Sequence, residues 1–142
     1  RADCVFINGN KDTTFEEKIY KINKNIQIFY SKYKIKNIEN LKNKEIIAFA
    51  GIGNPSNFFD LLKENNINIK KFYHFSDHHN YSQKDFDKIL VKDCDYDRIK
   101  IVTTEKDYCR MNEEQKKNCD SVEIDLEIEN KNEFINLIKS KI

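Results

Sequence analysis

Residues 45–59 read EIIAFAGIGNPSNFF, and this stretch decides the fold class. Its first six residues are a continuous apolar run, which is typical of a strand covered on both faces of a parallel sheet. A turn follows at Gly51 and Gly53, and Asn54 and Pro55 suit the N-cap and the first position of a helix. The stretch therefore predicts a strand that leads through a tight turn into a helix.

The same alternation continues toward the C-terminus. Further strands are predicted at residues 67–75, 98–102 and 122–126, each followed by a helical stretch. From residue 45 the order is β-α-β-α-β-α-β-α, which predicts an α/β fold: a mostly parallel sheet flanked by helices, with right-handed crossovers. The alternating residues 122–126 predict a half-exposed strand at an edge of this sheet.

The N-terminal third is less regular. Residues 4–8 predict a short buried strand, and residues 26–33 a half-exposed one. Residues 14–24 are charged and weakly periodic, and they predict no definite element. With residues 26–44 interpreted as a small β-ribbon, the expected organisation is a first strand and ribbon connection at 1–44 and a C-terminal α/β domain at 45–142.

Charge and hydropathy exclude two classes of protein. The chain has 142 residues, with 25 Lys and Arg against 24 Asp and Glu. A nucleic-acid-binding domain normally shows a basic excess or stripe, and this sequence has neither. No stretch approaches the roughly 20 apolar residues of a transmembrane helix. We therefore expect no nucleic-acid partner and no membrane span in this chain.

The cysteines and the N-terminus carry two further expectations. The four cysteines, at positions 4, 94, 109 and 119, contain no CxxC pair, so we expect free thiols and no metal site. The chain begins at Arg1 and enters an apolar strand almost at once. We expect it to be part of a longer protein.

The glycine turn is the first candidate site. Gly51, Gly53 and Asn54 let the backbone approach a ligand at a helix N-terminus. However, Ser56 stands where a dinucleotide-binding fingerprint requires its third glycine, and no G-x-x-x-x-G-K-[ST] phosphate-binding loop occurs in the sequence. A tight strand-to-helix turn without a ligand is the alternative.

The second candidate is Asp77-His78-His79, in the next strand-to-helix loop. An aspartate can fix the tautomer of a neighbouring imidazole, and a loop histidine is a natural general base or a helper of one. Adjacent side chains in a loop point in different directions, so we expect one histidine to face the site. A pair of surface or capping histidines is the alternative. Ser82 and Asp85 follow at the spacing of a capping box.

The third candidate follows the strand at 98–102. Thr104 is suited to cap the next helix, and Lys106 can reach a phosphate as a point charge. An ordinary helix start is the alternative. Because the carboxyl ends of parallel strands emerge at one edge, all three loops should lie at the same edge of the sheet.

Together the three motifs resemble the C-terminal part of the tetraacyldisaccharide 4′-kinases. The resemblance is carried by residues 49–55 with Phe58 and Phe59, by residues 75–81 and by residues 103–107, and the start at residues 1–8 also fits. It covers essentially the whole chain.

The resemblance implies a lipid A biosynthesis enzyme. Such a kinase uses ATP and Mg²⁺ to phosphorylate the 4′ position of the lipid A disaccharide precursor, at the cytoplasmic face of the bacterial inner membrane. The implied fold is a P-loop-type kinase core joined by a β-ribbon to a C-terminal α/β portion. The implied catalytic residues here are His78, oriented by Asp77, and their partner is an aspartate from the N-terminal portion.

The resemblance also implies what this chain lacks. The phosphate-binding loop, the metal ligands and the partner aspartate belong to the N-terminal kinase portion, so the isolated chain should be inactive. The alternatives are a non-catalytic α/β remnant or binding module, a split enzyme whose N-terminal portion is a separate polypeptide, and a dinucleotide-binding oxidoreductase, which Ser56 disfavours.

Overall fold

The computed structural model describes residues 2–90 and 98–141, and Cys94 lies outside them. The chain forms two compact units: unit 1 comprises Arg1–Lys34 and Asp125–Ile142, and unit 2 comprises Ile35–Ile124. The sequence instead predicted a division of the chain between residues 44 and 45. That domain division stays a prediction, because the compact units are defined by contacts and not by domain boundaries.

The helices and strands follow in chain order. They are β1 (Cys4–Asn8), α1 (Thr13–Ile22), β2 (Gln27–Ile35), the 3₁₀ turn η1 (Ile38–Asn40), β3 (Glu45–Ala50), α2 (Pro55–Glu64), β4 (Ile69–His74), α3 (Gln83–Ile89), β5 (Ile99–Thr104), α4 (Glu105–Cys109), α5 (Glu113–Lys116), β6 (Asp120–Val122), β7 (Ile124–Ile128) and α6 (Lys131–Lys139).

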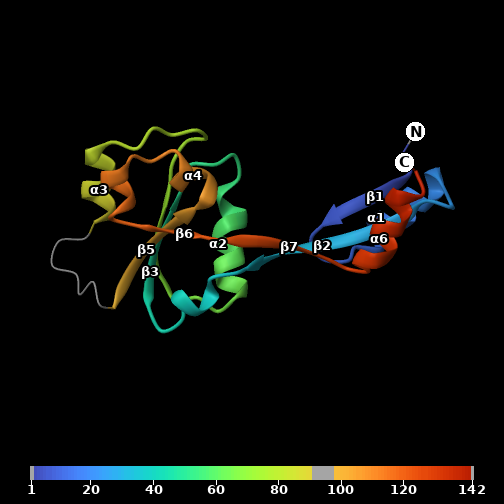
Figure 1. Cartoon of the computed structure of the whole chain (residues 1–142), viewed down its shortest axis with the longest axis horizontal. Coiled ribbons are helices and arrows are strands. Elements are labelled where there is room, and N and C mark those ends of the chain that lie inside the picture. Colours follow the sequence, from blue (N-terminus) through green and yellow to red (C-terminus); the bar gives the residue numbers. More distant parts are fainter. Residues whose placement is uncertain (1, 91–97, 142) are drawn as a thin grey trace. The chain divides into compact units, whose positions relative to one another are not determined.

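Unit 2 is built on a four-stranded sheet with the order β4-β3-β5-β6, in which every neighbouring pair is parallel (Figure 1). The predicted α/β class and parallel sheet are confirmed. The strand at residues 45–50 has the predicted bounds, and α2 begins at Pro55 as expected. The order also places β3 between β4 and β5.

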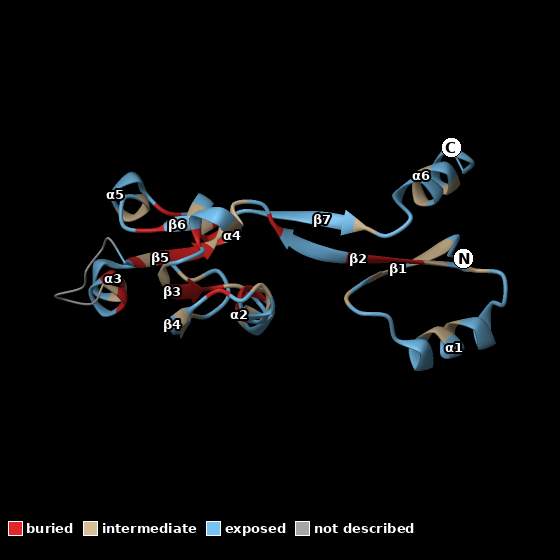
Figure 2. Cartoon of the chain, turned by 90° about the horizontal axis from the view of Figure 1, so that it is seen from below, coloured by how far each residue is buried: buried red, intermediate tan, exposed pale blue. Residues whose placement is uncertain are grey.

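The apolar run of β3 is explained by helices on both faces of the sheet. Ile46 and Ala48 pack in one buried cluster with α2, and Ile47 and Phe49 pack in a second cluster with α3. Residues 46–50 are all at most 1% exposed (Figure 2). A strand with both faces covered has no polar side, so its alternation disappears.

The strand predicted at 122–126 is wrong as a single element. The structure divides it: β6 ends at Val122 and pairs with β5, whereas β7 begins at Ile124 and belongs to the other sheet. The break is at Glu123, whose amide donates to Asn37 Oδ1 (3.1 Å). Val122 is 1% exposed and Ile124 is 39% exposed, so one alternating pattern covered residues in different surroundings.

Unit 1 contains a three-stranded sheet with the order β1-β2-β7, in which β1 is parallel to β2. The helix expected after residue 126 is present as α6, and it packs on this three-stranded sheet. The ring centroid of Phe134 lies 5.0 Å from that of Phe6 and 5.1 Å from that of Phe29.

Residues 13–22, for which the sequence predicted no element, form α1, whose N-cap Asp12 accepts from Phe15 N (2.9 Å). No helix in the described ranges is both long and apolar enough to cross a membrane.

Candidate active site

The three predicted loops meet at the carboxyl edge of the parallel sheet in unit 2. Gly51 follows β3, His78 follows β4 and Asp107 lies in α4, directly after β5. His78 N donates to Gly51 O (3.1 Å), and Gly51 N donates to an oxygen of Asp107 (2.9 Å). The central position of β3 allows its loop to bond to both neighbours. The predicted convergence is therefore observed, while the roles of these residues in function stay proposals.

Asp107 is the buried centre of this arrangement. Its side chain has no exposed surface, and one carboxylate oxygen accepts from Gly51 N and Thr104 Oγ1, both at 2.9 Å. The other oxygen accepts from Arg110 Nη2. Thr104 caps α4, as predicted, by accepting from Asp107 N (3.1 Å). The carboxylate thus joins the β3 loop to the start of α4.

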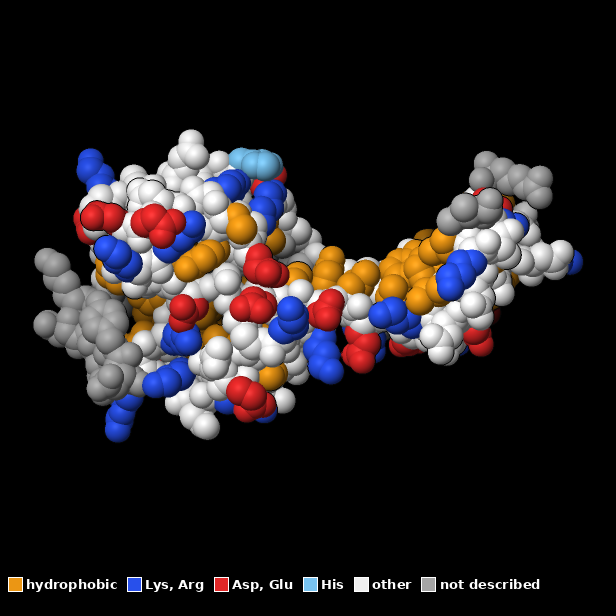
Figure 3. Space-filling model, viewed as in Figure 1, with side chains coloured by type: hydrophobic (Ala, Val, Ile, Leu, Met, Phe, Trp, Pro, Cys, Tyr) orange, Lys and Arg blue, Asp and Glu red, His pale blue; other side chains and the backbone are white. Residues whose placement is uncertain are grey.

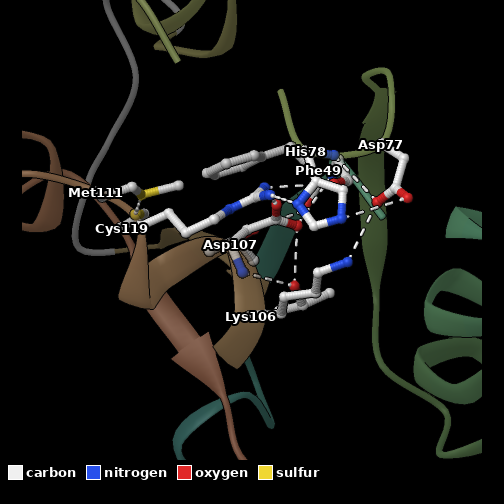
Figure 4. Close-up of polar contacts among 11 residues, drawn as sticks. Phe49, Asp77, His78, Lys106, Asp107, Met111 and Cys119 are labelled. Atoms are coloured by element: carbon white, nitrogen blue, oxygen red, sulfur yellow. Dashed lines mark hydrogen bonds and ion pairs between the residues drawn. The ribbon is translucent and has the colours of Figure 1, made fainter. Parts of the chain in front are cut away.

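Asp77, His78 and Lys106 form the exposed part of the site, and Figure 4 shows the three side chains close together. Figure 3 shows histidine at the surface next to Lys or Arg and Asp or Glu side chains. Lys106 Nζ lies 3.2 Å from one oxygen of Asp77, and His78 Nε2 lies 3.7 Å from the other. The hydrogen bond from Lys106 and the proximity of His78 lower the pKa of Asp77. The three side chains are 45%, 70% and 48% exposed in that order, so a substrate or a further polypeptide can reach them.

The backbone of His78 is in the left-handed region, with φ 57°. Its amide donates to Asp77 Oδ1 (3.0 Å) as well as to Gly51 O. The other non-glycine residues with positive φ in the described ranges are three asparagines, the residue type that best tolerates this conformation. Such strain persists only where surrounding contacts hold it, and it is concentrated at functional sites.

His79 points elsewhere, as the sequence led us to expect of one of the two histidines. Its Nε2 lies 3.1 Å from Asp85 Oδ2, and its ring packs against Phe75 (4.7 Å) and Tyr81 (5.1 Å). The predicted capping box of Ser82 and Asp85 is confirmed at the start of α3. His79 thus supports the loop and the helix cap.

The capping carboxylate should make stability depend on pH. Hydrogen bonds from the Ser82 side chain and backbone, opposed by partial burial, lower the pKa of Asp85 to about 2. Because the folded-state pKa lies below the ordinary value of 3.8, the stabilisation is complete above that value and is lost as pH falls toward 2. We expect Asp85→Asn to lower the free energy of unfolding by about 1 kcal/mol at neutral pH.

Urea unfolding followed by circular dichroism between about pH 5 and pH 2 measures this effect. The gap between the parent and Asp85→Asn should narrow as the pH falls. Asp87→Asn, an exposed change on the same helix, is the matched control and should stay within about 0.5 kcal/mol of the parent. A gap that is constant with pH would contradict the assignment.

The two turn glycines differ in their surroundings. A Cβ on Gly51 would lie 2.9 Å from Tyr81 Oη and 3.1 Å from both His79 Cβ and Ser76 O. A Cβ on Gly53 would contact only Asp77, at 3.7 Å or more. Gly51 is therefore required by close packing of the chain itself. Gly53 is exposed and has no such constraint.

Asn54 is the N-cap of α2 as predicted, but its side chain makes no capping hydrogen bond.

Gly51→Ala is expected to destabilise the chain by about 1–3 kcal/mol because the new methyl group overpacks the turn. Gly53→Ala is the control and should change stability by less than about 0.5 kcal/mol. The Tyr81 hydroxyl is buried without a hydrogen-bond partner in the described residues, and it is the atom nearest to the new methyl group. Adding Tyr81→Phe to the Gly51→Ala variant removes that hydroxyl and should therefore restore part of the lost stability. Equal effects of the two alanine variants in urea unfolding would refute this distinction.

The described residues do not fit a metal ion. Across residues 2–90 and 98–141, no three or more His, Cys, Asp or Glu residues lie in a group that could hold one. Cys4, Cys109 and Cys119 are free thiols, and burial raises the pKa of Cys119 to about 12.

Sequence reasoning missed Asp107 and Arg110 as members of the site. Arg110 Nη1 lies 3.1 Å from His78 Nδ1, and Nη2 donates to Gly51 O (3.3 Å). No spacing rule connects an arginine with a histidine 32 positions away. The one available signal was that α4 begins at the same sheet edge as the histidine loop.

A family model and two curated relatives similar to this chain share one description. A family model described as tetraacyldisaccharide-1-P 4′-kinase matches residues 1–142. The tetraacyldisaccharide 4′-kinase of Pelagibacter ubique (strain HTCC1062) is 37% identical over an alignment of 139 residues, and the match covers 95% of this chain and 44% of that protein. The enzyme of the same description from Rickettsia typhi is 37% identical over 114 residues, 78% of this chain and 33% of that protein.

A solved structure has a similar fold. The crystal structure of LpxK from Aquifex aeolicus in complex with ATP superposes with a TM-score of 0.56 at 17% identity, and the match covers 99% of this chain and 53% of that chain. The chain thus spans less than half the length of the curated relatives it matches and about half of the solved one.

Proposed function

This chain belongs to the tetraacyldisaccharide-1-P 4′-kinase family, and from this we propose that it is the C-terminal portion of a kinase that phosphorylates the lipid A disaccharide precursor. The complete enzyme would transfer the γ-phosphoryl group of ATP to the 4′-hydroxyl of tetraacyldisaccharide 1-phosphate. The observation that carries the proposal is the convergence of the Gly51, His78 and Lys106 loops at one sheet edge.

ATP and Mg²⁺ are assigned to the rest of the kinase. The 142 residues contain no G-x-x-x-x-G-K-[ST] motif, and the described residues include no group of three or more His, Cys, Asp or Glu suited to a metal ion. We accordingly expect the isolated chain to transfer no phosphate. The substrate or nucleotide cleft that faces the N-terminal portion is proposed to be lined by Gly51, Gly53, Asn54, Thr104 and Lys106.

The role proposed for His78 is to support the base that accepts the proton of the 4′-hydroxyl. A guanidinium only donates hydrogen bonds, so the contact with Arg110 leaves Nδ1 as an acceptor and places the ring proton on Nε2. Nε2–H is then a donor toward carboxylates. It lies 3.7 Å from Asp77 Oδ2, too far for a full hydrogen bond, and so is available to an aspartate of the N-terminal portion.

The location follows from the substrate. A tetraacylated disaccharide is retained by a membrane, so we propose that the complete kinase acts as a peripheral enzyme at the cytoplasmic face of the bacterial inner membrane.

A chimera tests the proposal. Residues 1–142 would replace the matching segment of the Pelagibacter ubique relative, and transfer of ³²P from γ-labelled ATP to tetraacyldisaccharide 1-phosphate would be measured. The chimera should phosphorylate the lipid, and the isolated chain should not. A folded chimera without activity, beside an active parent relative, would favour the alternative of a non-catalytic α/β module.

A further inference from the structure

Arg110 is the C-cap residue of α4, and its guanidinium contacts three parts of the site. Nη2 pairs with Asp107 and donates to Gly51 O (3.3 Å), while Nη1 lies 3.1 Å from His78 Nδ1. One rigid planar group therefore links α4, the β3 loop and the exposed histidine.

The anchor of this guanidinium is fixed. Asp107 is fully buried and is itself held by Gly51 N and Thr104 Oγ1. The Arg110 side chain is 28% exposed, compared with 70% for His78. His78 is the more exposed partner of Arg110. Because Arg110 is held by the buried carboxylate, its contact with Nδ1 can restrict the motion of the exposed ring.

We propose that Arg110 is a positioning residue for His78. It holds the imidazole through Nδ1, keeps the ring proton on Nε2 and directs Nε2 toward the side of the site where Asp77 lies. The purpose of this positioning rests on the proposed kinase function, but the positioning itself does not, because it is a property of the ring in this chain.

Lysine and methionine at position 110 separate positioning from structural support. Lysine retains a positive charge opposite Asp107, but a single ammonium cannot reproduce the planar fork that spans Asp107, Gly51 and His78. Arg110→Lys should therefore keep the fold while releasing the histidine. Arg110→Met also removes the charge, so this variant should lose both the stability of the fold and the position of the histidine.

Nuclear magnetic resonance of the 142-residue chain tests the proposal directly. Ring ¹³C relaxation at about pH 8.5, where a histidine side chain is generally neutral, reports the order of each imidazole. His79, which is held by Asp85 in the same loop, is the internal control. In Arg110→Lys we expect the order parameter of His78 to fall by at least about 0.2 while that of His79 stays unchanged.

Three results would overturn the proposal. They are a mobile His78 ring in the parent chain, a fall of the His78 order parameter by less than about 0.2 in Arg110→Lys, and an equal fall of the His79 order parameter, which would assign Arg110 a general packing role.

Arg110→Lys in the chimera should also lower kcat about tenfold with the KM for ATP unchanged. A folded chimera without activity, beside an active parent relative, counts against the kinase function and leaves the relaxation result to decide the positioning.

Discussion

Replacing Asp107 with alanine is expected to lower the free energy of unfolding by about 3–5 kcal/mol, since it removes a fully buried carboxylate that accepts hydrogen bonds from Gly51, Thr104 and the partly exposed Arg110. The substitution leaves the buried Gly51 amide and the Thr104 hydroxyl without their acceptor. Unpaired buried donors carry the cost of their lost hydration. The carboxylate joins the β3 loop to both ends of α4, so the loss should exceed that of any surface pair.

Urea unfolding of the intact chain, followed by circular dichroism, measures the effect. Glu113→Ala is the control, because Glu113 is 87% exposed and pairs with Lys116 at 3.0 Å on the surface. That variant should change stability by less than about 1 kcal/mol. A loss of under about 1 kcal/mol in Asp107→Ala would show that the carboxylate does not hold the loops together.

The parts of the fold that were predicted from sequence depend on local patterns. The continuous apolar run gave β3 with its bounds, and Pro55 marked the start of α2. The capping box at Ser82 was readable because its partners are three residues apart. The site edge also followed from topology, since parallel strands carry their outgoing loops to one side.

The parts that were missed depend on contacts distant in sequence. Alternation at 122–126 does not reveal that Val122 and Ile124 pair in different sheets, because both sheets demand the same period. The position of α6 is set by the contact of Phe134 with Phe6, which is 128 positions away, counted as 134 minus 6. Asp107 stands in the first turn of α4, where an acid is common, so its residue type does not reveal its burial.

His78→Asn is expected to reduce kcat of the chimera at least about 100-fold, the usual worth of acid–base assistance. Asparagine is the informative replacement because it accepts the positive φ of this position, as Asn43, Asn66 and Asn130 do. The variant therefore removes the imidazole without adding backbone strain. Its thermal unfolding midpoint should match that of the parent chimera within a few degrees.

His79→Ala is the matched comparison. It removes the neighbouring imidazole, which contacts Asp85 and the aromatic rings beside it. We expect this change to reduce stability more than His78→Asn does and to affect kcat less.

We propose that this chain supplies the histidine that assists phosphoryl transfer. The most direct measurement is the single-turnover rate of ³²P transfer from ATP to tetraacyldisaccharide 1-phosphate, by the chimera and by its His78→Asn variant, at saturating ATP. A rate at least about 100-fold lower in a stably folded variant is the expected result. A rate within about threefold of the parent would contradict the claim.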